Sequence, residues 1–169
     1  MTKTLTTSRL ILRSLEVSDA EFIMWLVNMP DWIRFIGERN VKNTADSEAY
    51  INNILEKPDL TYWVIDLKEN KIPIGIVTFV KRENLEYHDI GFALLSEYEK
   101  NGYAYEAAEK VMDEMSQNPL NKIILATTLG NNHKSISLLE KLGLKYSYTV
   151  PEENKELLIF SSQKRTNLK

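Results

Sequence analysis

The residues best suited to chemistry lie between positions 97 and 107, where Gly102 and the small Ala104 separate an apolar stretch from a helical one. We expect a strand to end there, a tight turn to carry Gly102, and a helix to begin at Tyr103. The free N–H groups and the dipole at the start of a helix attract anions, and successive amides in such a turn can form a nest for a phosphate. The segment therefore predicts an anion site, although an ordinary turn that uses glycine would have the same sequence.

Several other kinds of site are not indicated. The turn matches neither G-x-x-x-x-G-K-[ST] nor G-x-G-x-x-G, so it predicts neither a P-loop nor a dinucleotide fingerprint. The chain has no cysteine, which excludes disulfides, thiolate metal sites and a cysteine nucleophile. This composition fits a reducing cytoplasm, and we expect the protein to be cytoplasmic and to hold no metal.

The charges are distributed unevenly. The net charge is −3 and the isoelectric point is near 5.5, which disfavours nucleic-acid binding through bulk electrostatics. Residues 86–117 hold many more acidic than basic side chains. This concentration fits a solvated helix face, or a cleft that favours a cationic amine substrate over an anionic one.

The pattern of the whole chain predicts a single domain, 1–169. With 169 residues, 43% of them hydrophobic, the chain can bury one sizeable core. No apolar run approaches the roughly 20 residues that span a bilayer, and residues 1–13 lack the apolar segment of a secretory signal. We therefore expect neither a membrane nor a nucleic-acid partner.

Short runs of apolar, β-branched and aromatic residues predict strands at 9–13, 62–67, 74–80, 86–95, 122–127, 146–150 and 157–161. Helical periodicity predicts helices at 16–29, 44–55, 103–115 and 134–142. The strand–helix–strand order from 86 to 127 requires a parallel crossover, whereas the hairpins around it require antiparallel pairing. The predicted fold class is α+β (mixed α/β), a mixed, mostly antiparallel twisted sheet of about seven strands with helices on both faces.

The first predicted helix carries clear boundary signals. Ser18 is a candidate N-cap, with Glu21 three residues later, and Pro30 ends the helix. The apolar residues at helical spacing, which we expect to face the core, are Phe22, Trp25, Leu26 and Met29. Thr44 or Asp46 is expected to cap the second helix.

Residues 99–104, at the turn, read Glu-Lys-Asn-Gly-Tyr-Ala, and further short motifs stand at 7–13, 73–75, 90–92, 106–107, 132–135 and 139–144. With these motifs the chain resembles the GNAT superfamily of acyl-CoA-dependent N-acetyltransferases, whose motif at the turn reads Gln/Arg-x-x-Gly-x-Gly/Ala. The order of the other motifs matches the branch of ribosomal-protein N-terminal acetyltransferases. The resemblance covers residues 7–162. It implies an acetyl-CoA-dependent N-acetyltransferase whose sheet splays between its fourth and fifth strands at a bulge.

Two residues depart from the family motif. Glu99 stands where Gln or Arg is usual, and Lys100 stands where many members of this branch have Gly. A carboxylate that points at a pyrophosphate weakens its binding, but backbone amides donate whatever the side chain is. Cofactor binding survives if Glu99 points to solvent, and Lys100 could compensate by pairing with a phosphate.

The resemblance implies a place for each part of acetyl-CoA. The pantetheine arm would pair with the main chain of the fourth strand, at Phe92, Ala93, Leu94 and Leu95. The pyrophosphate would lie on the turn, at Lys100, Asn101, Gly102, Tyr103 and Ala104. Asn132 would reach the cofactor arm, with Ser135 one helical turn further on. Asn132 also has an alternative role as the cap of the last helix.

The family reaction is direct attack of an amine on the thioester, so a base must accept the proton of the amine. The candidates are Asp89, which matches an acidic position of the family, His88, which titrates near neutral pH, and Glu86. Since alternate residues of a strand face opposite sides, Asp89 and His88 cannot share one cleft unless a bulge intervenes. A backbone N–H near the bulge would stabilise the thioester oxygen. Ser135 would protonate the departing thiolate, with Tyr103 and Tyr146 as alternatives.

The acceptor site is harder to predict. In this fold the first two helices and their loop form one wall of the acceptor cleft, so Trp32 and Phe35 are expected to bind the substrate, whereas Trp25 is expected in the core. The acceptor would be a primary amine, on a protein N-terminus or a small molecule. A homodimer through exposed strand edges is compatible with the pattern.

The alternative function is a catalytically inactive acyl-CoA-binding or interaction module on the same fold. Glu99 and the lack of an unambiguous base leave this alternative open. Acceptor-dependent release of CoA from acetyl-CoA distinguishes the enzyme from such a module.

Overall fold

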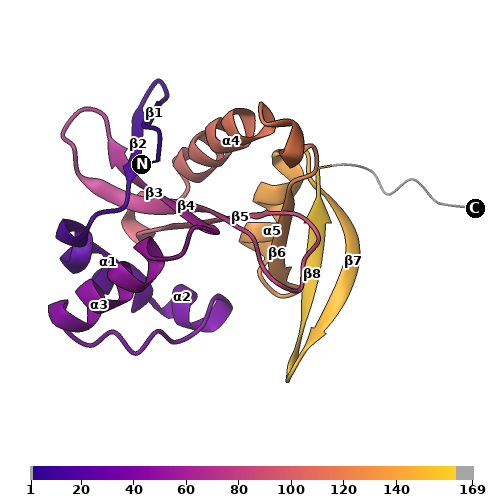
Figure 1. Cartoon of the computed structure of the whole chain (residues 1–169), viewed down its shortest axis with the longest axis horizontal. Helices are drawn as coiled ribbons and strands as arrows, with labels where there is room; N and C mark the ends of the chain where they lie inside the picture. The colour runs from indigo at the N-terminus through magenta and orange to yellow at the C-terminus, as the bar shows by residue number, and fades with distance from the viewer. Residues whose placement is uncertain (1, 163–169) are drawn as a thin grey trace, which may run out of the picture.

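The computed structural model describes residues 2–162, which form a mixed α+β fold around one sheet (Figure 1). The strands are β1 (Leu5–Thr6), β2 (Leu10–Ser14), β3 (Leu60–Leu67), β4 (Pro73–Val80), β5 (Asp89–Leu94), β6 (Leu125–Leu129), β7 (Lys145–Glu152) and β8 (Lys155–Ser161). Their order in the sheet is β1-β2-β3-β4-β5-β6-β8-β7. The predicted fold class is confirmed, and the two-residue β1 is an addition to the predicted strands.

The sheet is divided between β5 and β6. The antiparallel β4–β5 ladder runs from Gly75 opposite Leu94 to Val80 opposite Asp89 without a register shift. By contrast, β5 and β6 are parallel and pair at one position, Asp89 opposite Leu125. The two strands therefore meet at their starts and then diverge. The predicted splay is present, but the expected bulge is not, because the ladder on the other side of β5 is continuous.

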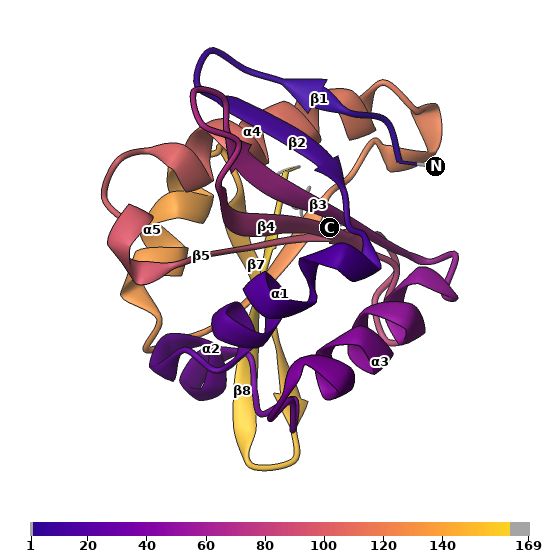
Figure 2. The same ribbon diagram turned by 90° about the vertical axis from the view of Figure 1, so that its left-hand side faces the viewer.

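Helices cover both faces of the sheet (Figures 1 and 2). One face carries α1 (Ala20–Val27), α2 (Pro30–Phe35) and α3 (Thr44–Leu55), which pack on Val64 and Ile76. The other face carries α4 (Tyr103–Ser116) and α5 (His133–Lys141), which pack on a larger cluster that includes Trp63 and Phe160. Short 3-10 turns are η1 (Val17–Asp19), η2 (Ser96–Tyr98) and η3 (Pro119–Asn121).

The first predicted helix differs from the prediction. The helix ends at Val27, and Pro30 begins α2 instead of only ending α1. Ser18 is not the cap, because it lies inside the 3-10 turn η1, whose N-cap is Glu16, and the residue that precedes α1 is Asp19. The second cap is also shifted, since Asn43 accepts the N–H of Asp46 at 2.9 Å.

The buried side of α1 is also different. The residues that face the core are Ala20, Ile23, Leu26 and Val27. This stripe is rotated from the predicted one, so Trp25 lies at the surface with 62% of its area exposed, and its prediction as a core residue is wrong. The aliphatic side of α1 is the buried one because it packs closely against Val64 of β3 and Ile76 of β4.

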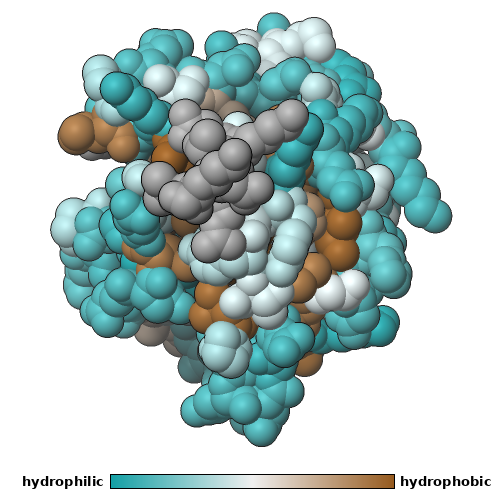
Figure 3. All heavy atoms as spheres, turned by 90° about the vertical axis from the view of Figure 1, so that its right-hand side faces the viewer, coloured by the Kyte–Doolittle hydropathy of each residue, from teal (hydrophilic) through white to brown (hydrophobic). Residues whose placement is uncertain are grey.

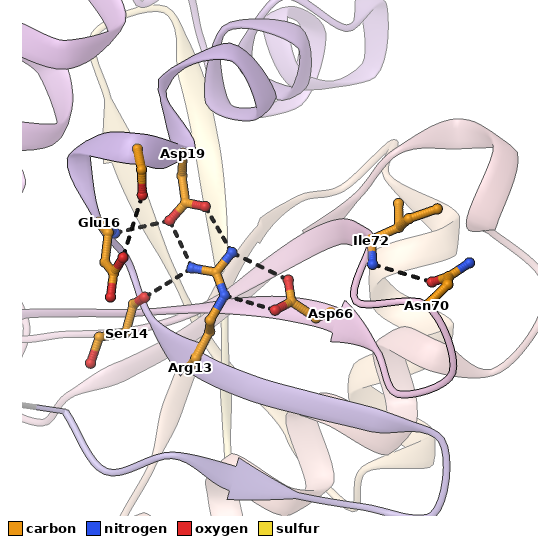
Figure 4. A network of polar contacts seen from close by, with 8 residues as sticks. Arg13, Ser14, Glu16, Asp19, Asp66, Asn70 and Ile72 are labelled. Atoms are coloured by element: carbon orange, nitrogen blue, oxygen red, sulfur yellow. Dashed lines mark hydrogen bonds and ion pairs between the residues drawn. The ribbon is translucent and has the colours of Figure 1, made fainter.

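A buried ion-pair network fixes where α1 begins (Figure 4). Arg13 on β2 donates two hydrogen bonds to the Asp19 carboxylate, at 2.8 and 2.9 Å, and its Nε lies 2.7 Å from Asp66 on β3. Burial raises the pKa of Asp66, although Arg13 acts in the opposite direction. The network ties β2, β3 and the start of α1 together, and so positions the helices that follow.

A small third cluster holds the closing hairpin. Leu85, Leu125 and Ile159 are buried there, and half-buried Tyr148 and Val150 of β7 pack against them. Figure 3 shows the face that carries this hairpin, where apolar side chains appear between hydrophilic ones. The cluster anchors β8 to β6 and fixes the far wall of the divergence. Within residues 2–162, no helix has both the length and the apolar character needed to cross a membrane.

Candidate active site

A groove of about 850 Å³ follows the divergence of β5 and β6. On one side it forms what we call the acceptor chamber, lined by Trp32, Phe35, Ile36, Arg39, Leu60, Tyr62, Thr78, Val80, Arg82 and Asp89. At what we call the α4 end, it is lined by Lys100, Gly102, Tyr103, Ala104, Asn132 and Ser135. The groove joins the predicted anion site to the predicted acceptor wall.

The register of β5 decides which of its backbone groups are free. The Leu95 N–H donates to Ile74 on β4, and His88 accepts from Leu125 on β6. Backbone groups alternate in direction along a strand, so residues 89, 91, 93 and 95 turn toward β4, and 88, 90, 92 and 94 turn toward β6. Beyond the single β5–β6 pair, the backbone N–H and C=O groups of Phe92 and Leu94 therefore have no hydrogen-bond partner on β6 among the described residues.

Two of the four predicted pantetheine contacts are corrected by this register. Ala93 turns its main-chain groups to β4, although its side chain lines the groove. Leu95 donates to Ile74, accepts from Tyr98 and does not line the groove. The backbone groups available to a ligand are those of Phe92 and Leu94.

The glycine turn has the conformation of an anion site. Gly102 is left-handed, with φ of +80°, and caps α4, so a side chain there would be strained. In residues 2–162, no hydrogen bond uses the N–H of Lys100, Gly102, Tyr103 or Ala104. Asn101 does not line the groove, because its side chain closes the turn on the carbonyls of Tyr98 and Glu99. The free amides fit an anionic group such as a pyrophosphate.

A network that the sequence analysis did not predict braces this turn. Glu106, in the first turn of α4, accepts hydrogen bonds from Thr7 at 2.6 Å and from the N–H of Arg9 at 3.0 Å. The Arg9 guanidinium pairs with the same carboxylate and donates to the Asn101 carbonyl at 2.9 Å. Although burial acts in the opposite direction, these hydrogen bonds hold the pKa of Glu106 below its ordinary value. The opening strand thus holds the start of α4 in place.

Glu99 is neutralised by a neighbour that is distant in sequence. Its carboxylate lines the groove and lies 2.8 Å from the Lys134 ammonium on α5, which also pairs with Asp31 on α2 at 3.3 Å. Glu99 therefore does not simply point to solvent. The charge that departs from the family motif is balanced by Lys134.

Asp89 is the buried carboxylate of the acceptor chamber. It is 3% exposed, pairs with the Arg82 Nε at 3.0 Å, and lies 3.4 Å from the Thr127 hydroxyl. Burial raises the pKa of Asp89, and Arg82 only partly opposes this. A carboxylate with a raised pKa is a better proton acceptor than an ordinary one.

His88 occupies the opposite side of the strand, as alternation predicts. Its ring stacks on Phe79, with centroids 4.8 Å apart, and it does not line the groove. Burial lowers the pKa of His88. The structure brings Asp89 but not His88 to the groove, and Glu86 also lies outside it.

The start of α5 places two predicted residues in the groove. Asn132 caps the helix, since its Oδ1 accepts the Ser135 N–H at 3.2 Å. Both residues also line the groove, so capping and ligand contact are compatible. Nearby on β6, the buried Thr128 hydroxyl has no hydrogen-bond partner among the described residues, although it too lines the groove.

Trp32 and Phe35, the predicted substrate-binding residues, line this part of the groove together with Arg39, which was not predicted. The acidic stretch does not make this chamber negative. Of its carboxylates, Asp89 and Glu99 line the groove, and both are ion-paired. The expectation of a cleft suited to a cationic substrate is therefore not supported.

Comparison with known proteins agrees with this geometry. The uncharacterized N-acetyltransferase YnaD of Bacillus subtilis (strain 168) is 26% identical over 141 residues, which cover 83% of this chain and 82% of the relative. An acetyltransferase (GNAT family) from Bacillus anthracis superposes with a TM-score of 0.79 at 22% identity, covering 94% of this chain and 97% of the other. The ribosomal-protein-S5-alanine acetyltransferase from Vibrio fischeri gives 0.77 at 19% identity, covering 99% and 100%.

These solved structures share the fold of this chain. The acetyltransferase (GNAT) domain itself matches residues 9–145, which include β5, the glycine turn and α5. With the groove, the free amides of α4 and the divergent strands in place, the chain belongs to the GNAT acetyltransferase family, whose acyl donor is acetyl-CoA.

Proposed function

We propose that this acetyltransferase moves the acetyl group of acetyl-CoA to a primary amine by direct attack on the thioester. The observation that carries the proposal is the continuous groove, which connects the free amides of α4 with the buried Asp89 carboxylate. One end suits a pyrophosphate, and the other offers a proton acceptor beside an apolar wall. Bound acetyl-CoA would supply the activated acetyl thioester.

The binding roles follow from the free backbone groups. The N–H groups of Gly102, Tyr103 and Ala104 would hold the pyrophosphate, and the free backbone groups of Phe92 and Leu94 would pair with the pantetheine arm. Phe92 carries the first N–H beyond the point where β5 and β6 part. That donor is placed to stabilise the negative charge that develops on the thioester oxygen.

The proton transfers need one acceptor and one donor. Asp89 would take the proton of the attacking amine, directly or through a water, as the new C–N bond forms and the C–S bond breaks. The Ser135 hydroxyl would donate to the departing sulfur and recover a proton from solvent, to which Asp89 releases the proton taken from the amine. Arg82 would keep Asp89 oriented and would balance its charge between turnovers.

The order of motifs supports the ribosomal-protein branch of the family, and the fold of the Vibrio fischeri protein is compatible with it. The acceptor classes of the proposal are a protein N-terminus and a small-molecule amine. Glu99 no longer argues for an inactive module, since Lys134 neutralises it.

The test is CoA release from acetyl-CoA over a panel of peptide N-termini and small amines. We expect release that depends on the acceptor, and its loss in Asp89→Asn. Glu86→Gln is the matched control, because Glu86 is an exposed carboxylate three residues away that does not line the groove. Acetyl-CoA binding without release for any acceptor would identify the inactive module instead.

A further inference from the structure

We infer that Arg39 and Trp32 form an anion-binding subsite in the acceptor chamber, and that the acceptor is a small amine bearing a carboxylate beyond an apolar spacer. The inference rests on the proposed function, because it names the substrate class of the same site. The charge of Arg39, the unpaired indole N–H of Trp32 and the apolar walls of the chamber support it.

Arg39 is the chamber cation with free binding capacity. It is half-buried, and its polar contact is a long one, 3.4 Å to the Gly37 carbonyl. Within residues 2–162, no carboxylate lies within ion-pair distance of Arg39, whereas Arg82 is paired with Asp89. A guanidinium with unused donors binds a carboxylate through two parallel hydrogen bonds.

Trp32 supplies an independent observation. Its side chain is 6% exposed and lines the chamber, yet its Nε1–H has no acceptor among the described residues. Trp63, by contrast, donates its Nε1–H to the Lys3 carbonyl at 3.1 Å. Buried donors are nearly always paired, so this one indicates a ligand that brings an acceptor. The Arg39 guanidinium lies 5.9 Å from the centroid of the Trp32 ring, close enough for one anionic group to meet both.

The chamber walls define the rest of the ligand. Leu60, Val80, Phe35 and Ile36 make its surface largely apolar, and Asp89 is the buried carboxylate beside them. The other carboxylates of the groove, Asp31, Glu99 and Glu152, are each paired with a lysine. An amine would therefore approach Asp89 at the strand divergence, and an apolar segment would separate it from the anion at Arg39. A diamine would bring its second ammonium toward Arg39, where like charges repel.

The kinetic test compares acceptors of equal length. The panel consists of ω-amino carboxylates of three to six carbons, with the alkylamines and α,ω-diamines of the same lengths. We expect kcat/KM for the best carboxylate to exceed that of its alkylamine by about tenfold, and the diamine to be the poorest. In Arg39→Gln the ratio of the two kcat/KM values should fall toward one, because KM for the carboxylate rises. Arg34→Gln is the matched control, because Arg34 lies on α2 shortly before the loop that carries Arg39, stacks on Phe35 and does not line the groove.

A binding test does not depend on turnover. The probes are the N-acetyl derivatives of the same ω-amino carboxylates, with N-alkylacetamides as neutral controls. Indole N–H resonances are followed in ¹⁵N-labelled protein, and Trp32→Phe assigns the Trp32 signal. We expect the carboxylates to shift Trp32 and not the exposed Trp25 or the paired Trp63. The shift should disappear in Arg39→Gln and persist in Arg34→Gln.

The two tests separate the two proposals. Diamines that match or exceed the carboxylates, or a Trp32 signal that responds equally to neutral amides, would overturn the anion subsite while transfer itself stands. If no amine is acetylated but the carboxylates shift Trp32 through Arg39, the subsite stands and the proposed transfer falls.

Discussion

Replacing Lys100 by glycine should stabilise the free protein and weaken its binding of acetyl-CoA. Lys100 has φ of +63°, in the left-handed region that favours glycine. A left-handed conformation costs a residue with a side chain about 1–2 kcal/mol, and glycine removes this cost. Glycine also makes the unfolded chain more flexible, which lowers the stability by about 0.5–1 kcal/mol. The free energy of unfolding should therefore rise by roughly 0.5–1 kcal/mol, which raises Tm by about 1–4 °C.

The effect on binding has the opposite sign. Lys100 is exposed at the α4 end of the groove, and a solvent-exposed ion pair is worth about 0.2–1 kcal/mol. Since Lys100→Gly keeps the backbone amide, Kd for acetyl-CoA should rise by no more than about fivefold. The loss should shrink at high salt, because screening weakens an exposed pair.

Lys71 provides the matched control. It has φ of +61°, lies in the turn between β3 and β4, and does not line the groove. Urea unfolding should show the same gain for Lys71→Gly, and calorimetric titration should show unchanged acetyl-CoA binding. Destabilisation by Lys100→Gly alone would refute the backbone argument. An unchanged Kd at low salt would refute the pairing of Lys100 with a phosphate.

Three further changes test the groove. Burial raises the pKa of Asp89, so the stability that this carboxyl contributes is present below the pKa of an unfolded aspartate and is lost as pH rises through the folded value. Asp89→Asn should therefore be at least as stable as the native protein at neutral pH, while CoA release falls at least about a hundredfold. Strong destabilisation of this variant in urea at pH 7 would show a structural role instead. Lys134→Ala should weaken acetyl-CoA binding several-fold in calorimetry, because it leaves the Glu99 charge unbalanced. Adding Glu99→Gln to this variant should restore the binding. An unchanged Kd in Lys134→Ala would show that Glu99 does not act on the cofactor. Ser135→Ala should keep the helix cap, because Asn132 accepts the backbone N–H of residue 135 and not its side chain. The free energy of unfolding should change by less than about 0.5 kcal/mol, while kcat falls. An unchanged kcat would assign the thiolate proton to another group.

The fold could be predicted because its signals are local. The runs of β-branched and aromatic residues in β3 and β4 and the helical spacing in α4 each lie within one element, and the order of the elements requires the parallel crossover. The face of α1 could not be predicted in this way. Phe22, Trp25 and Leu26 fit a helical stripe as well as Ile23, Leu26 and Val27 do, and only packing against the sheet selects the second.

The site shows the same division. Gly102 and the free amides of its turn follow from a local motif, and so does the cap at Asn132. The backbone groups of Ala93 and Leu95 are unavailable because of the register with β4, which no segment of β5 contains by itself. Arg9, Lys134 and Arg39 were missed because their partners or neighbours in the groove come from other elements, brought together only by the folded sheet.

The central claim is that the groove between β5 and β6 binds acetyl-CoA through both its diphosphate and its pantetheine arm. The most direct measurement is the unfolding temperature as a function of acetyl-CoA, with adenosine diphosphate as the control. A ligand of the folded state stabilises it by about 2.7 kcal/mol at one hundred times Kd, which corresponds to roughly 5–10 °C here. We predict a concentration-dependent rise that is larger for acetyl-CoA than for the diphosphate. No rise at millimolar acetyl-CoA, or equal rises with the two ligands, would contradict the account.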